Sequence, residues 1–62
     1  MIVGMNCFVF DKYGHLLDKH TFWSLDEKVL RAAVDAFITA ISIYNKDYKA
    51  MRTPLIYNFE ED

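Results

Sequence analysis

The residues that could do chemistry in this sequence are one cysteine and two histidines, Cys7, His15 and His20. A thiol beside an imidazole can act as a nucleophile, because the imidazole accepts the thiol proton. A hairpin that pairs Phe10 with Leu16 in an uninterrupted register would place Cys7 and His20 on opposite faces of the sheet. We therefore expect Cys7 to be buried and unreactive, and we predict no catalytic residue.

Metal binding needs more donors than the sequence offers. A structural zinc site takes about four Cys or His ligands, and this chain falls short of that number. Asp18 and His20 lie two apart on one strand face and could share a ligand, but a third donor is missing. We predict no metal and no cofactor, and we expect His15 to pair with Asp11 across the end of the hairpin.

A short basic row provides an alternative based on nucleic-acid binding. Lys46, Lys49 and Arg52 lie near two tyrosines, and lysine and arginine side chains contact phosphates. Basic residues also suit the C-terminal end of a helix, where the dipole is negative, and Asp47 interrupts the row. We rank nucleic-acid binding by the segment Lys46 to Arg52 below protein binding.

Two strands joined by a tight turn are expected to carry the cysteine and both histidines. The first ten residues are rich in Ile, Val, Met and Phe, which favours a strand. The segment from Asp11 to Gly14 is typical of a type I turn in which Gly14 takes the left-handed conformation. A second strand, from about Leu16 to Trp23, then folds back on the first.

One long helix and a last strand are expected to follow. Ser24 can cap the helix, and Glu27 can complete a capping box. The helical periodicity continues to at least Tyr44, so the helix ends either near Asn45 or near Arg52.

The segment Leu55 to Phe59, after Pro54, is expected to add a short edge strand, and residues 60–62 to form a frayed acidic tail. The sequence therefore predicts a single α+β domain over residues 1–62, in the order β-β-α-β, with an antiparallel sheet packed on one helix.

Such a small domain has too little interior for its apolar residues. A chain of this size buries about 60% of the surface that its unfolded form exposes, yet 53% of the residues are hydrophobic. Since a lone cysteine cannot form a disulfide within the chain, a partner chain is the expected supplement to the core.

The predicted helix is apolar over most of its circumference. Between Val29 and Tyr44 the apolar residues span roughly 240° of the helical wheel, far more than the ~100° stripe that docks on a core. Leu30, Val34 and Ile38 are large side chains of this arc. We expect them to contact a partner.

The predicted hairpin is apolar on both faces. One face suits the helix, and it holds Val3, Met5, Cys7, Val9, Leu17 and Trp23. The other face has no element left to cover it, and it holds Phe8, Phe10, Leu16 and Phe22, with His20 at its polar margin. Because a sheet that is apolar on both faces is normally covered on both, we expect the second face to bind a partner.

The hairpin segment Phe10-Asp11-Lys12-Tyr13-Gly14-His15-Leu16-Leu17 resembles the opening hairpin of longin- and roadblock-type domains, which also place a long helix after two strands. The resemblance implies the same order of elements. It covers only this segment, and no function is carried over from it.

The sequence favours the cytoplasm. Its first six residues lack the basic region and the cleavage site of a signal peptide. Arg31 and Asp35, which we expect to form an ion pair on the helix, interrupt the longest apolar stretch and argue against a membrane span. A single unpaired cysteine is typical of a reducing compartment.

These observations predict a non-catalytic protein–protein interaction module, homodimeric or docked on a larger protein, that serves as a small regulator or inhibitor. Short acidic chains of this kind include virus-encoded antagonists of host enzymes. Two alternatives stay open. One is nucleic-acid binding, and the other is a ligand carrier or enzyme whose site forms only at a dimer interface, with Asp18 and His20 as its polar groups.

Overall fold

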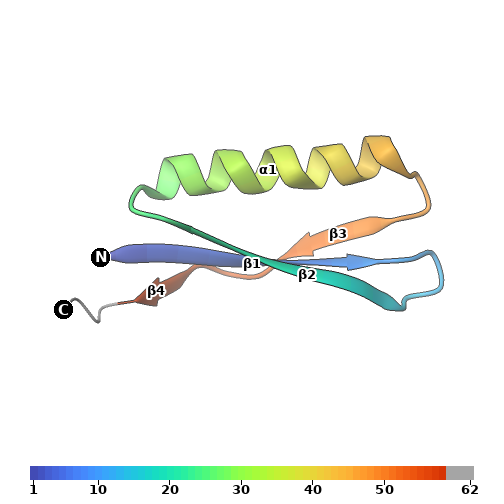
Figure 1. Ribbon diagram of the computed structural model, residues 1–62, viewed down its shortest axis with the longest axis horizontal. Helices are drawn as coiled ribbons and strands as arrows, with labels where there is room; N and C mark the ends of the chain where they lie inside the picture. Colours follow the sequence, from blue (N-terminus) through green and yellow to red (C-terminus); the bar gives the residue numbers. More distant parts are fainter. Residues whose placement is uncertain (59–62) are drawn as a thin grey trace.

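The protein consists of four strands and one helix, in a computed structural model that describes residues 1–58 (Figure 1). The elements are β1 (Ile2–Phe10), β2 (Leu16–Ser24), α1 (Glu27–Tyr44), β3 (Lys49–Arg52) and β4 (Ile56–Asn58). An antiparallel hairpin, one helix and returning short strands confirm the predicted α+β class. The predicted tail, residues 60–62, lies outside the described residues.

The central strand of the sheet is β1. It pairs with β2 on one side and with both β3 and β4 on the other, and all three pairings are antiparallel. Between β3 and β4, the hydroxyl oxygen of Thr53 accepts a hydrogen bond from the Asn6 N–H at 3.1 Å, and the Thr53 N–H donates to the Asn6 carbonyl at 2.9 Å. These bonds continue the pairing of β1 across the gap. Of the two short strands, only the last was predicted.

A side-chain cap begins the helix, and a backbone hydrogen bond from the Asn45 N–H to the Ile41 carbonyl at 3.0 Å ends it. Asp26, rather than the predicted Ser24, is the N-cap, and its carboxylate accepts a hydrogen bond from the Lys28 N–H at 2.8 Å. At the other end Asn45 has extended backbone, and its side-chain oxygen accepts from the Asp47 N–H at 2.9 Å. Of the two ends that the periodicity allowed, the one near Asn45 is therefore correct, and the chain is free to form β3.

The turn between β1 and β2 has the predicted geometry. Gly14 has a φ of 87°, which is a conformation that other residues adopt at a cost. Its N–H donates to the Asp11 carbonyl at 3.1 Å, and the Asp11 N–H donates to the His15 carbonyl at 3.0 Å. This pattern is a type I turn closed by a left-handed glycine.

A β-bulge just after the turn overturns the predicted hairpin register. Leu16 lies opposite Phe10, but Asp18 lies opposite Val9, so β2 has one extra residue at this point. Because side chains alternate between faces, the shift moves every later residue of β2 to the other face. Phe22 is opposite Met5 and Trp23 is opposite Gly4, so the predicted faces of both aromatic residues are wrong.

The core lies between α1 and one face of the sheet (Figure 1). The buried residues alternate along β1 and lie one turn apart on the helix. They are Val3, Met5, Cys7, Val9, Leu30 and Val34. The ring of Phe22 packs against this core, with its centroid 5.4 Å from that of Phe37. Alternation along β1 thus follows the prediction, whereas Phe22 takes the place expected for Trp23.

The molecule is thin, with extents of 41 × 19 × 15 Å along its principal axes. A two-layer structure of this thickness has one layer of buried side chains and leaves the far face of the sheet to the solvent. Within residues 1–58, no helix has the length and the apolar character that a bilayer crossing requires.

Candidate interaction surface

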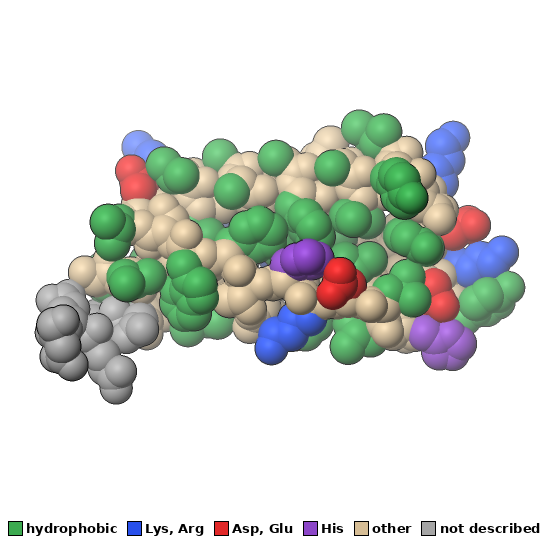
Figure 2. All heavy atoms as spheres, in the orientation of Figure 1, with side chains coloured by type: hydrophobic (Ala, Val, Ile, Leu, Met, Phe, Trp, Pro, Cys, Tyr) green, Lys and Arg blue, Asp and Glu red, His purple; other side chains and the backbone are tan. Residues whose placement is uncertain are grey.

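The face of the sheet opposite α1 is largely apolar, and no described helix or strand covers it. We call it the open face and define it by Ile2, Phe8, Phe10, Leu16, Trp23, Met51 and Ile56, which the strand pairings place together. Trp23, Met51 and Leu16 are 51%, 54% and 56% exposed. Figure 2 shows hydrophobic side chains both in the seam between α1 and the sheet and along the lower side of the strands, away from the helix.

Trp23 lies flat over Gly4 at one end of the open face. The two residues are cross-strand partners, and a methyl group on Gly4 would overlap the ring atoms Cζ3 and Cε3 of the indole. Glycine is therefore required at this position of β1 to let the ring approach the backbone. The contact leaves the other side of a large aromatic ring available to a partner.

The charges on the open face are of one sign. Lys19 and Lys49 lie on it, with Lys19 Nζ 6.0 Å from the centroid of the Phe8 ring. The strand residues that alternation places on this face include no Asp or Glu. The strands of the open face thus combine partly exposed aromatic side chains with two cations and no anion.

His20 and Asp18 lie on the helix side of β2. The sequence had instead predicted His20 at the margin of the face that holds Phe8 and Phe10. The His20 Nε2 atom is 2.9 Å from Asp18 Oδ2, and the imidazole centroid is 4.9 Å from that of Phe37. Both polar side chains remain about half exposed. Within residues 1–58, no group of three or more His, Cys, Asp or Glu is placed to hold a metal ion.

The bulge also brings Cys7 opposite His20 on the same face, which the uninterrupted register had excluded. The Cys7 side chain is fully buried, and burial raises the pKa of its thiol, an effect that the Arg52 guanidinium opposes only in part. A nucleophilic cysteine needs a lowered pKa and access to its substrate. The buried thiol of Cys7, with its raised pKa, meets neither condition, so this arrangement does not support nucleophilic chemistry.

The helix offers less free surface than its apolar arc predicts. Leu30 and Val34 are fully buried, and Ile38 packs against the core, so these three residues serve the fold of the chain itself. Their assignment to an exposed partner surface is wrong, because the sheet is wide enough to cover that side of the arc. Val29 and Ile43 remain exposed on the outer side of the helix.

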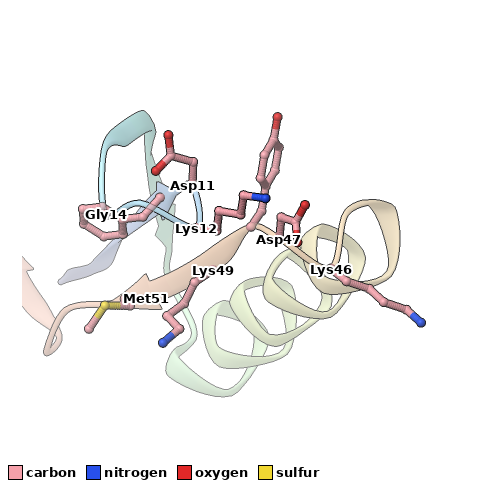
Figure 3. A pocket seen from close by; sticks show the side chains of 9 residues that line it. Asp11, Lys12, Gly14, Lys46, Asp47, Lys49 and Met51 are labelled. Atoms are coloured by element: carbon pink, nitrogen blue, oxygen red, sulfur yellow. The ribbon is translucent and has the colours of Figure 1, made fainter.

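The predicted basic row is dispersed by the strand β3. Arg52 lies on the helix side and its guanidinium forms an ion pair with Asp35 at 2.7 Å, whereas Lys49 lies on the open face. Lys46 and Lys49 both border a hollow between the β1–β2 turn and the α1–β3 loop, and Figure 3 shows the Lys46 side chain directed away from the other labelled residues. These three residues do not form one basic surface.

The ion pairs of the helix also differ from the prediction. Arg31 pairs with Glu27, with 2.8 Å between Nε and Oε2, rather than with Asp35. At the turn, His15 Nδ1 lies 3.1 Å from Asp11 Oδ2, which confirms the predicted pair. All of these pairs are partly exposed, so each contributes little to stability.

The open face includes four residues that the sequence did not place there. Trp23 was assigned to the other side, and Ile2, Met51 and Ile56 were assigned to no face. Gly4 could have indicated the face on which Trp23 lies, because a glycine within a strand often accommodates an aromatic ring from the neighbouring strand. No known protein family, curated protein or solved structure matches this chain.

Proposed function

We propose that this protein binds another protein through the open face and acts as a small regulator or inhibitor, not as an enzyme. The observation that supports the proposal is the exposure of Leu16, Trp23 and Met51 on one side of the sheet. Contiguous exposed apolar surface is uncommon on soluble monomers and marks interaction sites. Large aromatic residues such as Trp23 commonly dominate the affinity of such a surface.

The charges define the chemistry of the partner. Lys19 and Lys49 border the aromatic residues, and this face offers them no carboxylate. A complementary partner presents an apolar patch with Asp or Glu at its rim, because opposite charges across an interface favour association. The buried Cys7 and the two-residue pair of Asp18 and His20 provide no comparable case for catalysis.

Single-stranded nucleic acid is the second candidate ligand. Aromatic rings with neighbouring cations can stack on bases and contact phosphates, and Phe8, Lys19 and Trp23 lie on one face. The aliphatic residues Ile2, Leu16 and Ile56 contribute nothing to stacking, which ranks protein binding first. Quenching of the Trp23 fluorescence by a short oligonucleotide, weakening steeply with salt, would reverse this order.

Matched charge substitutions test the proposed surface. Met51→Glu and Leu16→Glu each place a carboxylate on the open face, whereas Ile43→Glu places one on the outer side of the helix, where Ile43 is 78% exposed. In affinity capture from native lysate of the source cells, wild type and Ile43→Glu should retain the same partner, and the two open-face variants should lose it. Retention by all four proteins, or loss by Ile43→Glu alone, would contradict the proposal.

A further inference from the structure

The outer edge of β2 exposes backbone groups along one side of the sheet, next to the open face. Among the described strands, β2 pairs only with β1, so one side of this nine-residue strand has no strand beside it. An edge strand presents a row of backbone donors and acceptors that can pair with another chain. Every residue from Leu16 to Thr21 is exposed, so the edge is accessible.

The hydrogen bonds of β1 identify which backbone groups of β2 point outward. Asn6 exchanges bonds with Thr53, so its N–H and C=O face away from β2. These groups alternate in direction along an antiparallel strand, so those of Cys7 and Met5 face β2 and bond to His20 and Phe22 opposite them.

The backbone groups of Lys19, Thr21 and Trp23 therefore point outward. A side-chain contact agrees with this direction, because the Lys19 N–H is bonded to Asp18 Oδ1 at 2.8 Å and not to a strand. Thr21 lies midway between Lys19 and Trp23, and it is also the midpoint of the regular part of β2 that follows the bulge.

We propose that a second copy of this chain occupies the β2 edge, in an antiparallel pairing with its two-fold axis at Thr21. In this register Thr21 faces Thr21 of the partner copy, and Lys19 faces Trp23, which allows about six backbone hydrogen bonds. A lysine opposite a tryptophan forms a cation–π pair, and two threonines are a favourable cross-strand pair. The product is one eight-stranded sheet, with both helices on the same side.

Charge favours this geometry over stacking of two open faces. Stacking would bring Lys19 and Lys49 of both copies together with no carboxylate between them, which opposes association. Edge pairing joins the open faces side by side and engages only Lys19, Thr21 and Trp23 at their shared border. It requires Asp18 to release the Lys19 N–H, and the carboxylate retains His20 as a neighbour. The pairing does not depend on the proposed function of the open face.

Charge variants at the two-fold axis test the register. Thr21→Glu and Thr21→Lys each place like charges directly opposite one another, so sedimentation equilibrium should show at least tenfold weaker self-association than in wild type. An equimolar mixture of the two variants should restore association, because unlike charges then face each other. Met51→Glu is the matched control on the open face, and its self-association should equal that of wild type.

Several results would overturn the inference. These are a wild type that stays monomeric up to millimolar concentration, charge variants that associate as wild type does, a mixture without rescue, and a loss of association in Met51→Glu. Amide hydrogen exchange of wild type is a second measurement that needs no folded variant. The Thr21 and Trp23 amides should become protected as concentration rises, and constant exchange would equally contradict edge pairing.

Discussion

Replacing Gly4 by alanine is the most informative single change in the sheet. The methyl group would overlap the Trp23 indole and force the ring away from β1. Since Trp23 is half exposed, the ring can move into solvent without disturbing the core. We therefore expect Gly4→Ala to lower the free energy of unfolding without changing the secondary structure.

The magnitude follows from the burial of Trp23. A tryptophan buries about 200 Å² when enclosed, so a half-exposed one buries about 100 Å², which corresponds to a ceiling of about 2.5 kcal/mol at ~25 cal/mol per Å². Displacing the indole ring from Gly4 removes part of this stabilisation, about 1–2 kcal/mol. Alanine also lowers the conformational entropy of the unfolded chain, which stabilises the folded protein by about 0.4–1 kcal/mol. The net destabilisation is then about 1 kcal/mol.

A double-mutant cycle isolates the contact. In a Trp23→Ala background the methyl group meets no ring, so Gly4→Ala should be neutral or stabilising by about 0.5 kcal/mol. Urea unfolding of the four proteins gives the coupling free energy, expected at about 1–2 kcal/mol. Because Trp23 is the only tryptophan, its emission in Gly4→Ala should shift to longer wavelength and become more accessible to acrylamide.

The hairpin register without the β-bulge leads to the opposite prediction for Gly4→Ala and Trp23→Ala. There Trp23 packs under the helix, so Gly4→Ala would leave its emission unchanged, and Trp23→Ala would cost the roughly 3–5 kcal/mol of a core aromatic residue. A coupling free energy near zero together with unchanged emission would refute the placement of Trp23 on the open face.

Three further substitutions probe the core, the thiol and the turn. Phe22→Ala should cost about 3 kcal/mol in urea unfolding, more than Trp23→Ala, because Phe22 packs against Phe37 and the core; an equal or smaller cost would contradict this. Burial raises the pKa of the Cys7 thiol, so the unfolded chain releases this proton at a lower pH than the folded one. The free energy of unfolding should therefore fall as pH rises above the ordinary thiol pKa, and Cys7→Ser should lack this slope. Hydrogen bonds from the N–H groups of His15 and Tyr13 hold the pKa of Asp11 below its ordinary value. The stabilisation is complete above the ordinary Asp pKa and is lost as pH falls through the lowered one, so Asp11→Asn should be less stable at neutral pH and lack this acid-side loss.

The features that the sequence predicted correctly are those set by local chemistry. The turn at Asp11 to Gly14 follows from one glycine and one aspartate at fixed spacing. Alternation along β1 placed Val3, Met5, Cys7 and Val9 in the core, because no bulge interrupts the pattern of that strand.

The errors come from contacts between distant segments. Leu16 and Leu17 both fit a strand, so nothing local indicates that one of them is an extra residue in the pairing with β1. That one residue changed the predicted face of Phe22, Trp23 and His20. The strand β3 is short and depends on pairing with β1, a long-range contact that local propensity does not report.

Photo-crosslinking in the source cells tests the open face most directly. Met51→p-benzoylphenylalanine puts the reactive ketone on the open face, and Ile43→p-benzoylphenylalanine puts it on the outer side of the helix, at an apolar position that is even more exposed. The proposed function predicts a discrete protein adduct from position 51 and none from position 43. The same adduct from both positions, or an adduct from position 43 alone, would contradict it.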